Sequence, residues 1–275
     1  MRPVNDVSEV MLDTERSEQT VWSELYRNAD RDTKNQLGIS IEKVLDADCL
    51  IMRNMPTWFL NRVIGLGLEQ PVTEQDIDDL IDLYHRNEVP MGISLCPGAE
   101  TEEIERWLIE RGFFIANNWV KMLRDVSPPI PSNSTLRVEL ARPDQSGIIA
   151  EIVKIGFELD EKLSSIFGTV VNSSNNRVYI AWDNEVPASV GMLTVVKNVG
   201  HLNTAATLPE FRGQGGQGAI MAKRIQDGIE LGCRCFVTET WDPGDEINHS
   251  YNNMLRHGFK LAYKRPNWTH DVPLK

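Results

Sequence analysis

The chain passes from a predicted strand into a predicted helix through Thr207-Leu-Pro-Glu-Phe-Arg-Gly-Gln-Gly-Gly-Gln-Gly-Ala-Ile220, and this stretch decides the fold of its second half. An extended segment, Val199 to Leu208, leads into a loop with four glycines among six residues. A helix follows, whose apolar face is formed by Ile220, Met221, Ile225 and Ile229. Free backbone N–H groups at a helix N-terminus, with roughly half a positive charge from the helix dipole, favour a bound pyrophosphate. Arg212 adds forked donors suited to phosphate.

Two common phosphate-binding motifs explain this loop poorly. A Walker loop ends in Gly-Lys-Ser/Thr, which does not occur here. The dinucleotide fingerprint G-x-G-x-x-G is matched by Gly213, Gly215 and Gly218, with Glu239 about 20 residues further on. However, fewer than ~60 residues follow, too few for a doubly wound sheet, and the strand His201 to Thr207 is too polar for a buried parallel strand. A nicotinamide-dependent oxidoreductase is therefore disfavoured.

The same run resembles the acyl-CoA loop of the GNAT superfamily of N-acyltransferases, where Arg/Gln-x-x-Gly-x-Gly/Ala follows an extended strand and a proline. Gln217 departs from this pattern, because Gly or Ala is usual there. The resemblance implies acetyl-CoA as cosubstrate, with the backbone of Thr207 pairing with the pantetheine arm. The residues expected to bind it are Thr207, Leu208, Arg212, Gly213, Gln214, Gly215, Gly216, Gln217 and Gly218. The alternative is a tight turn without a ligand.

A proline- and serine-rich segment, residues 127–134, divides the chain into units 1–126 and 135–275. Both units close with a helix, a Gly-Phe pair (Gly112-Phe113 and Gly258-Phe259) and a strand. GNAT domains commonly end in this way. We therefore expect an α/β (α+β) fold of two tandem GNAT-like domains, each a mixed, mostly antiparallel twisted sheet flanked by helices. The resemblance is specific in the second unit and only architectural in the first.

The corresponding loop of the first unit is Gly65-Leu-Gly-Leu-Glu-Gln-Pro-Val-Thr73. It has no arginine and carries Glu69, which would repel a pyrophosphate. We therefore interpret the first unit as a degenerate GNAT-like domain that has lost CoA binding.

Periodicity and turn residues predict the remaining elements. Polar helices are expected at the start, and their apolar faces include Val21, Leu25, Leu37, Ile41 and Val44. A capping box at Thr73 and Asp76 predicts a helix start. Further helices are expected at Ser146 to Phe157 and Ile247 to His257. Strands are expected at Cys49–Met52, Asn61–Leu68, Met91–Cys96, Phe113–Leu123, Val178–Trp182, Ala188–Val196 and Arg234–Thr240.

The net charge of −12 is unevenly distributed. Residues 1–130 hold 13 Lys and Arg against 24 Asp and Glu, a net −11. This charge disfavours nucleic acid and anionic membranes as partners. A solvated acidic surface explains it, and attraction of a cationic amine substrate is the more specific alternative.

The polar, acidic stretch Met1 to Gln19 is unlike a signal peptide, and no apolar run reaches the ~20 residues that span a bilayer. The four cysteines lack metal-ligand spacing. We expect a cytoplasmic protein with reduced thiols and no metal.

In GNAT enzymes the acceptor amine attacks the thioester directly, so proton carriers are needed. Glu239 is the expected general base, because it lies in a strand suited to burial, where desolvation raises a carboxyl pKa. His249 and His201 are alternatives.

The resemblance places a general-acid Tyr at position 254, which is Met254 here; Tyr251, on a similar helix face, could substitute. The equally weighted alternative for Tyr251 is a partly buried core aromatic. Asn253 matches an Asn of some family variants and could bind CoA, or it is simply a polar group on the helix face.

The sequence thus predicts an N-acetyltransferase that acts on a small-molecule or peptide amine, and the family makes a homodimer an open option. The main alternative is a non-catalytic acyl-CoA-binding sensor or interaction protein, which the lack of a Tyr at Met254 favours.

Overall fold

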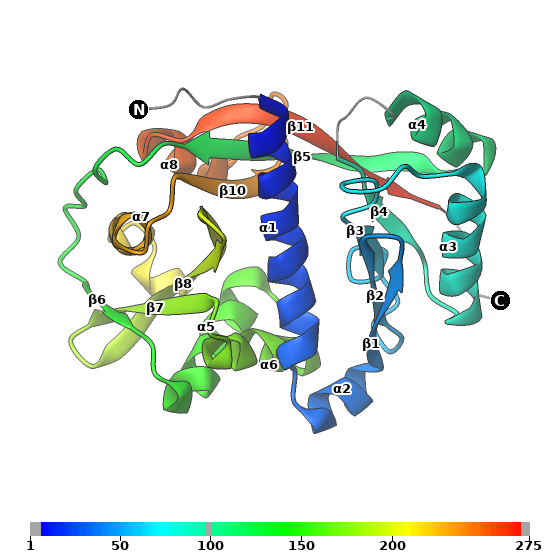
Figure 1. Cartoon of the computed structure of the whole chain (residues 1–275). Coiled ribbons are helices and arrows are strands. Elements are labelled where there is room, and N and C mark those ends of the chain that lie inside the picture. The colour runs from blue at the N-terminus through cyan, green and yellow to red at the C-terminus, as the bar shows by residue number, and fades with distance from the viewer. Residues whose placement is uncertain (1–6, 97–100, 271–275) are drawn as a thin grey trace.

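The computed structural model describes residues 7–96 and 101–270 of the chain (Figure 1). The first half contains α1 (Val7–Asn28), α2 (Arg31–Leu37), β1 (Ile39–Val44), β2 (Ala47–Met52), β3 (Arg62–Ile64), α3 (Glu74–Arg86), β4 (Gly92–Ser94), α4 (Thr101–Glu110) and β5 (Phe114–Arg124). The second half contains β6 (Arg137–Leu140), α5 (Ser146–Phe157), α6 (Glu161–Thr169), β7 (Asn176–Asp183), β8 (Val186–Val196), β9 (Val199–Thr207), α7 (Gly216–Glu230), β10 (Cys235–Trp241), α8 (His249–Arg256) and β11 (Lys260–Thr269).

The strands form one continuous sheet in the order β1-β2-β3-β4-β11-β5-β10-β9-β8-β7-β6. Only β3–β4 and β9–β10 pair in parallel, so the sheet is mixed and mostly antiparallel, as predicted. The two closing strands have exchanged places. β5 of the first half pairs with β10 of the second, whereas β11 of the second half pairs with β4 of the first. β5 and β11 also pair with each other and run side by side across both halves (Figure 1).

This exchange gives each half a core that contains side chains from the other. Val120 and Met122 of β5 are buried in the cluster beneath α7 and α8. Trp268 of β11 is buried in the cluster beneath α3 and α4. A third cluster is shared by the halves, because Leu25 and Tyr26 of α1 pack with residues of α5, α6, β7 and β8.

Helix α1 crosses the middle of the molecule and contacts strands of both halves, β1 and β2 on one side and β8 and β9 on the other (Figure 1). In β7 the alternation of a strand separates the two faces of the sheet. Val178 and Ile180 join the cluster with α1, α5 and α6, whereas Tyr179 and Ala181 join the cluster with α7. Helices α1, α5 and α6 therefore cover one face of this half-sheet, and α7 covers the other.

Local predictions were borne out where the turn chemistry was strong. Thr73 and Asp76 form the predicted capping box at the start of α3, and α5 spans Ser146–Phe157 as expected. The prediction that Ile41 and Val44 lie on helix faces is wrong, because both lie in β1. Gly38 ends α2 in the left-handed conformation at φ 67°.

The strand expected at Asn61 to Leu68 is shorter than predicted and ends at Ile64. The next residues include Gly65 and Gly67, both at positive φ, which takes the chain out of the sheet. Within residues 7–96 and 101–270, no helix is long and apolar enough to cross a membrane.

Candidate active site

The glycine loop joins β9 to α7, and among the described residues the first backbone amides of α7 have no hydrogen-bond partner. Gly213 and Gly215 have φ of 82° and 78°, a conformation that favours glycine. Gly215 is the N-cap of α7 and contributes no side-chain cap, and the first turn of α7 has no acidic residue. In the described part of the chain, the amides of Gly216, Gln217 and Gly218 have no hydrogen-bond acceptor. These donors, at the positive end of the helix dipole, suit an anion.

Gln217, the residue that departs from the family pattern, fastens this loop to the sheet. Its side-chain Nε2 donates to the carbonyl oxygens of Ala206 (2.7 Å) and Val190 (3.2 Å) and to Oγ1 of Thr207 (2.9 Å). The register of β8 and β9 shifts between Val190 and Met192, and this irregularity frees carbonyl groups that the amide of Gln217 satisfies. The larger side chain therefore leaves the backbone amide of Gln217 available.

The segment between the halves also supports the loop. Ser134 Oγ donates to the carbonyl of Gln214 (2.7 Å), and Ser132 Oγ donates to that of Gly215 (3.4 Å). Arg124, the last residue of β5, donates to the carbonyls of His257 (2.9 Å) and Pro128 (2.8 Å). The proline-rich segment is thus docked against the loop.

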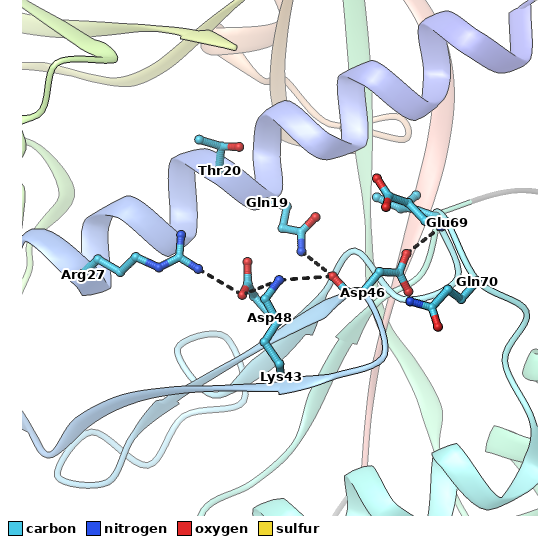
Figure 2. A pocket seen from close by; sticks show the side chains of 9 residues that line it. Gln19, Thr20, Arg27, Lys43, Asp46, Asp48, Glu69 and Gln70 are labelled. Atoms are coloured by element: carbon cyan, nitrogen blue, oxygen red, sulfur yellow. Dashed lines mark hydrogen bonds and ion pairs between the residues drawn. The ribbon is translucent and has the colours of Figure 1, made fainter. Parts of the chain in front are cut away.

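The corresponding loop of the first half, between β3 and α3, is closed by its own side chains. Thr73 and Asp76 cap α3 reciprocally, and Glu74 and Asp76 place carboxylates in its first turn. The amide of Glu69 donates to Asp46 Oδ2 (2.6 Å), as Figure 2 shows. The adjoining pocket of about 370 Å³ is polar, and its cations Arg27 and Lys43 both pair with Asp48.

A much larger cavity, about 1160 Å³, opens beside the glycine loop of the second half. β9 and β10 pair only between Val199–His201 and Cys235–Val237 and then separate. The cavity is lined on either side of this gap by Leu202–Ala205 of β9 and Thr238–Trp241 of β10. Its volume exceeds the usual range of roughly 300–1,000 Å³ for a site that binds one small molecule.

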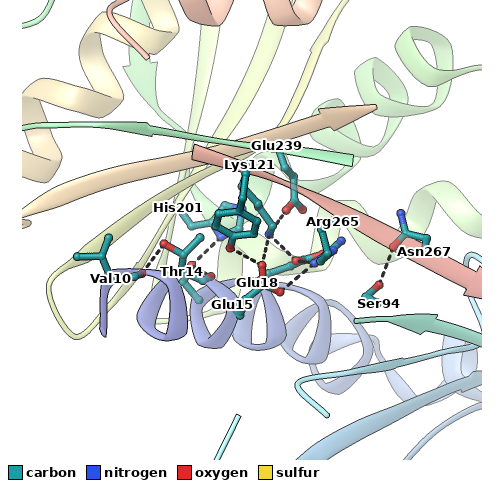
Figure 3. Close-up of polar contacts among 12 residues, drawn as sticks. Val10, Thr14, Glu15, Glu18, Ser94, Lys121, His201, Glu239, Arg265 and Asn267 are labelled. Carbon is teal, nitrogen blue, oxygen red and sulfur yellow. Dashed lines mark hydrogen bonds and ion pairs between the residues drawn. The ribbon is translucent and has the colours of Figure 1, made fainter. Parts of the chain in front are cut away.

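Glu239 lies at this gap, directly opposite Lys121 of the exchanged strand β5. The Lys121 ammonium donates to Glu239 and also to Glu18 Oε2 of α1 (2.5 Å), and Figure 3 shows the three side chains converging. Lys121 is fully buried and Glu239 nearly so. The ion pair therefore joins a carboxylate of the second half to a cation supplied by the first.

The ion pair belongs to a larger buried network beneath α1 (Figure 3). Arg265 of β11 pairs with Glu18 and with Glu15 Oε2 (3.2 Å). Tyr263 donates its hydroxyl to Glu15 Oε1 at 2.5 Å. Buried carboxylates and cations thus neutralise one another, which buried charges require.

Burial raises the pKa of Glu239, and the neighbouring carboxylate of Glu18 raises it further; Lys121 and Arg265 oppose this without cancelling it. Burial alone lowers the pKa of Lys121, but the carboxylates around it outweigh burial and raise that pKa. Lys121 therefore stays charged, while Glu239 gains basicity at a position that faces the cavity.

His201, an alternative base, is buried under α1 with its Nδ1 2.9 Å from Ser17 Oγ. Burial, with Lys121 nearby, lowers the pKa of His201 to about 3. His201 is therefore neutral and weakly basic at physiological pH. It is absent from the residues that line the cavity, whereas His249 is among them.

Comparison with solved structures identifies the architecture. The chain resembles a GCN5-related N-acetyltransferase from Kribbella flavida with a TM-score of 0.65 at 14% identity, over 94% of this chain and 96% of that one. The chain has the GNAT fold. A GCN5-related N-acetyltransferase from Sphaerobacter thermophilus matches with a TM-score of 0.59 at 11% identity, over 81% and 79% of the two chains.

The tandem form of the GNAT fold also has a solved counterpart. A tandem GNAT protein from the clavulanic acid biosynthesis pathway matches with a TM-score of 0.58 at 11% identity, over 81% of this chain and 77% of that one. No protein-family model matches the sequence. A search among curated proteins also found no match.

Within this GNAT fold, the cavity gathers most of the residues predicted for the site. Those that line it are Thr207, Arg212, Gly213, Gly215, Gly216, Gln217, Gly218, Glu239 and Asn253. Three others are not among the lining residues. The Leu208 amide donates to the carbonyl of Ala188 (3.0 Å), and the Gln214 carbonyl accepts from Ser134. Tyr251 is half-buried against the cluster under α7 and α8.

Sequence reasoning missed the part of the site that the first half supplies. Trp22 of α1, Phe59 and Trp119 of β5 line the cavity, and Lys121 holds Glu239. A lysine in the otherwise apolar run Trp119 to Leu123 was the one available signal. In residues 7–96 and 101–270, no group of three or more His, Cys, Asp or Glu residues could hold a metal ion.

Proposed function

We propose that the chain is an N-acetyltransferase that uses acetyl-CoA to acetylate an amine. The observation that carries the proposal is the open N-terminus of α7, whose free amides face the same cavity as the buried carboxylate of Glu239. The proposal assigns acyl transfer to residues 135–275, joined by segment 127–134 to unit 1–126.

The open N-terminus of α7, with the amides of Gly216, Gln217 and Gly218, would hold the pyrophosphate of acetyl-CoA, and we call it the cradle. Gly216, Gln217 and Gly218 offer backbone donors, and Arg212 lines the cavity beside them. Asn253 of α8 lines the same cavity as a further polar contact. The gap between β9 and β10, where Thr207 also lies, leads from the cradle to Glu239 and would take the pantetheine arm.

Bound acetyl-CoA supplies an activated acyl group as a thioester. An acceptor amine is an ammonium ion at neutral pH and must lose a proton before its nitrogen can attack the acyl carbon. Glu239 would take this proton, because burial has raised its pKa while Lys121 holds it in place. The new C–N bond forms as the C–S bond breaks, and a second proton leaves the nitrogen and neutralises the departing CoA thiolate, which gives the free thiol. Tyr251 as the proton donor stays a prediction.

The test of this function is thermal melting of the purified protein with acetyl-CoA, CoA and NAD, followed by thiol release with a panel of amines. A ligand that binds only the folded state at a hundred times its Kd stabilises it by about 2.7 kcal/mol. We expect acetyl-CoA and CoA to raise the Tm, and Arg212→Glu to abolish most of the shift. Arg31→Glu, an exposed arginine of α2, is the matched control and should retain the shift.

Glu239→Gln should retain the acetyl-CoA shift but lower kcat by about 10²-fold or more, since it removes the base and keeps the side-chain shape. Absence of a shift with either CoA species would refute the proposal, and a shift with NAD alone would favour an oxidoreductase.

A non-catalytic acyl-CoA sensor is the second candidate. It is favoured by Met254, which lines the cavity where the family places a tyrosine, and by Tyr251, which is not among the lining residues. A sensor would bind CoA but release no thiol with any amine, and Glu239→Gln would leave CoA binding unchanged.

A further inference from the structure

We propose that the acceptor is a primary amine that carries an aromatic group and no carboxylate. This inference rests on the proposed function and concerns the part of the cavity that lies away from the glycine loop, toward α1 and α6. We call this part the aromatic bay and define it by six lining residues: Trp22, Phe59, Trp119, Leu163, Phe167 and Trp241.

The walls of the bay are aromatic and come from both halves. Trp22 and Phe59 meet edge to face with ring centroids 5.3 Å apart and an interplanar angle of 89°. Phe59 and Trp119 are 5.6 Å apart with their planes tilted by 43°. Leu163 and Phe167 of α6 are buried among the same cluster of apolar side chains. An aromatic ring that enters the bay finds rings for edge and face contacts and removes apolar surface from water.

A buried arginine holds these rings from behind. The guanidinium carbon of Arg62 lies 4.1 Å from the ring centroid of Trp22, 4.6 Å from that of Phe59 and 5.8 Å from that of Trp119. Arg62 is fully buried, and none of its three side-chain nitrogens has a hydrogen-bond partner among the described residues. Its cation therefore meets the three ring faces, which fixes the rings before any ligand arrives.

The charges around the bay select against an acceptor carboxylate. On the side of α5 and α6 the charged lining residues are Glu158 and Asp160, and both are acidic, whereas the carboxylate of Glu239 at the gap is already paired with Lys121. The arginines on the cavity wall are Arg212 in the glycine loop, Arg224 in α7, whose Nη1 donates to the carbonyls of Met192 and Asn203, and Arg256 in α8. None of these three comes from α5 or α6. An ammonium ion is attracted to the bay, whereas a carboxylate would meet like charge.

Arg62 does not supply the missing cation for a carboxylate. It is absent from the residues that line the cavity, and three of those that do (Trp22, Phe59 and Trp119) stand around its guanidinium. A carboxylate could reach Arg62 only if these rings moved apart. An amino acid acceptor thus requires a rearrangement that an aryl amine does not.

The experiment compares three acceptors with acetyl-CoA: phenethylamine, L-phenylalanine, which adds only a carboxylate, and ethylamine, which lacks the ring. We expect kcat/KM for phenethylamine to exceed that for ethylamine at least tenfold, from burial of the ring, and that for L-phenylalanine by more. Phe59→Ala and Trp241→Ala should lower the preference of phenethylamine over ethylamine by about tenfold. Trp107→Ala removes an aromatic side chain outside the cavity and should keep that preference.

Three results separate this inference from the proposed function. Equal turnover of L-phenylalanine and phenethylamine, or of ethylamine and phenethylamine, would overturn the acceptor class and leave the acetyltransferase standing. If no amine releases thiol, calorimetry with CoA and phenethylamine shows whether phenethylamine binds in the aromatic bay. Phenethylamine binding that is weakened in Phe59→Ala supports the bay although the proposed catalysis fails, and no binding refutes both. In every variant, the Tm shift with acetyl-CoA reports whether the protein is folded.

Discussion

The helix that follows each glycine-containing loop begins differently in the two halves. In the first half, α3 is capped by Thr73 and Asp76, and its first turn carries two carboxylates. In the second half, α7 begins behind Gly215 with no side-chain cap and no acidic residue, and its first amides have no acceptor among the described residues. The first helix satisfies donors at its start with its own side chains, and the second leaves its first amides without acceptors in the described part of the chain.

This difference shows how one fold can hold one open and one closed helix start. Unsatisfied N–H groups at a helix start cost stability, and capping side chains recover about 1 kcal/mol. The open end of α7 is therefore a local weakness that ligand binding would offset, whereas the closed end of α3 contributes stability directly. In the loop before α3, Asp46 accepts from the Glu69 amide, so this backbone donor is also satisfied by a side chain (Figure 2).

The first half nevertheless belongs to the candidate site. It supplies Trp22, Phe59 and Trp119 as cavity walls and Lys121 as the partner of Glu239. The comparison therefore separates two contributions: the second half provides the cradle, and the first half provides walls and a cation.

The largest effect is expected when a carboxylate is introduced into the first turn of α7, as in α3. Gly218 is the third residue of α7, the position that Asp76 holds in α3. Gly218→Asp would place a carboxylate among the free amides, so acetyl-CoA affinity should fall about a hundredfold or more from like-charge repulsion and competition for the donors. Isothermal calorimetry measures the Kd.

Gly218→Asn is the matched control, because it has the same shape without the charge. In both variants the new Cβ would lie 3.2 Å from His257 Nε2, so any steric effect is shared. If the two variants lose affinity equally, the electrostatic account of the cradle is wrong.

The next effect tests the contribution of the first half. Lys121 lowers the pKa of Glu239, so Lys121→Met should raise that pKa further and reduce the ionised fraction of the base at a given pH. We expect kcat/KM to fall about tenfold to a hundredfold near pH 7 and to recover as the pH rises, whereas Lys121→Arg should be close to the native protein. The pH profile is the measurement.

Loss of one partner from a buried ion pair also destabilises a fold by about 3–5 kcal/mol. The acetyl-CoA Tm shift must therefore be checked in Lys121→Met before its kinetics are read. If Lys121→Met is folded and the acidic side of its kcat/KM pH profile matches that of the native protein, Lys121 does not influence the base.

The contact between the halves should also appear as pH-dependent stability. His201 of β9 stays neutral beneath α1 with a pKa of about 3, against 6.5 for an unperturbed histidine. The unfolded chain takes up a proton below pH ~6.5 and the folded chain does not, so stability falls as the pH drops from about 6.5 toward 3. His201→Gln should reduce this slope by roughly 1.4 kcal/mol per pH unit near pH 5.

Urea unfolding at pH 7, 6 and 5 measures this slope. His85→Gln, an exposed histidine of α3, serves as the control and should leave it unchanged. Parallel slopes for native and His201→Gln proteins would show that folding does not lower the pKa of His201.

The elements that depend on neighbouring residues in the chain could be predicted from the sequence. The capping box at Thr73 and the glycines after Arg212 act within a few residues of themselves, so their structure follows from their neighbours in the chain. The assignment of Ile41 and Val44 failed, because β-branched residues in a short polar stretch fit either element until the pairing with β2 decides.

The exchange of β5 and β11 could not be predicted from local sequence patterns. Both strands follow the same helix–Gly–Phe pattern, and nothing in that pattern states which sheet each strand joins. The ion pair of Lys121 and Glu239 and the ring cluster around Arg62 depend on that exchange and on the path of α1. The part of the candidate site nearest in sequence to the loop was therefore predicted, and the part contributed by the first half was missed.

The smallest effect is expected from removing the side-chain cap of α3. Thr73→Ala removes the cap of α3 and should lower the free energy of unfolding by about 1 kcal/mol, because the Asp76 amide loses its Oγ1 acceptor at the helix start. Acetyl-CoA affinity should not change, since the proposed acetyl-CoA site lies at the start of α7 and not at this helix. Gln75→Ala, an exposed change in the same turn, should stay within about 0.5 kcal/mol of the native protein. A Thr73→Ala protein with native stability, or with altered acetyl-CoA affinity, would mean that the two helix starts do not differ in the way their capping indicates.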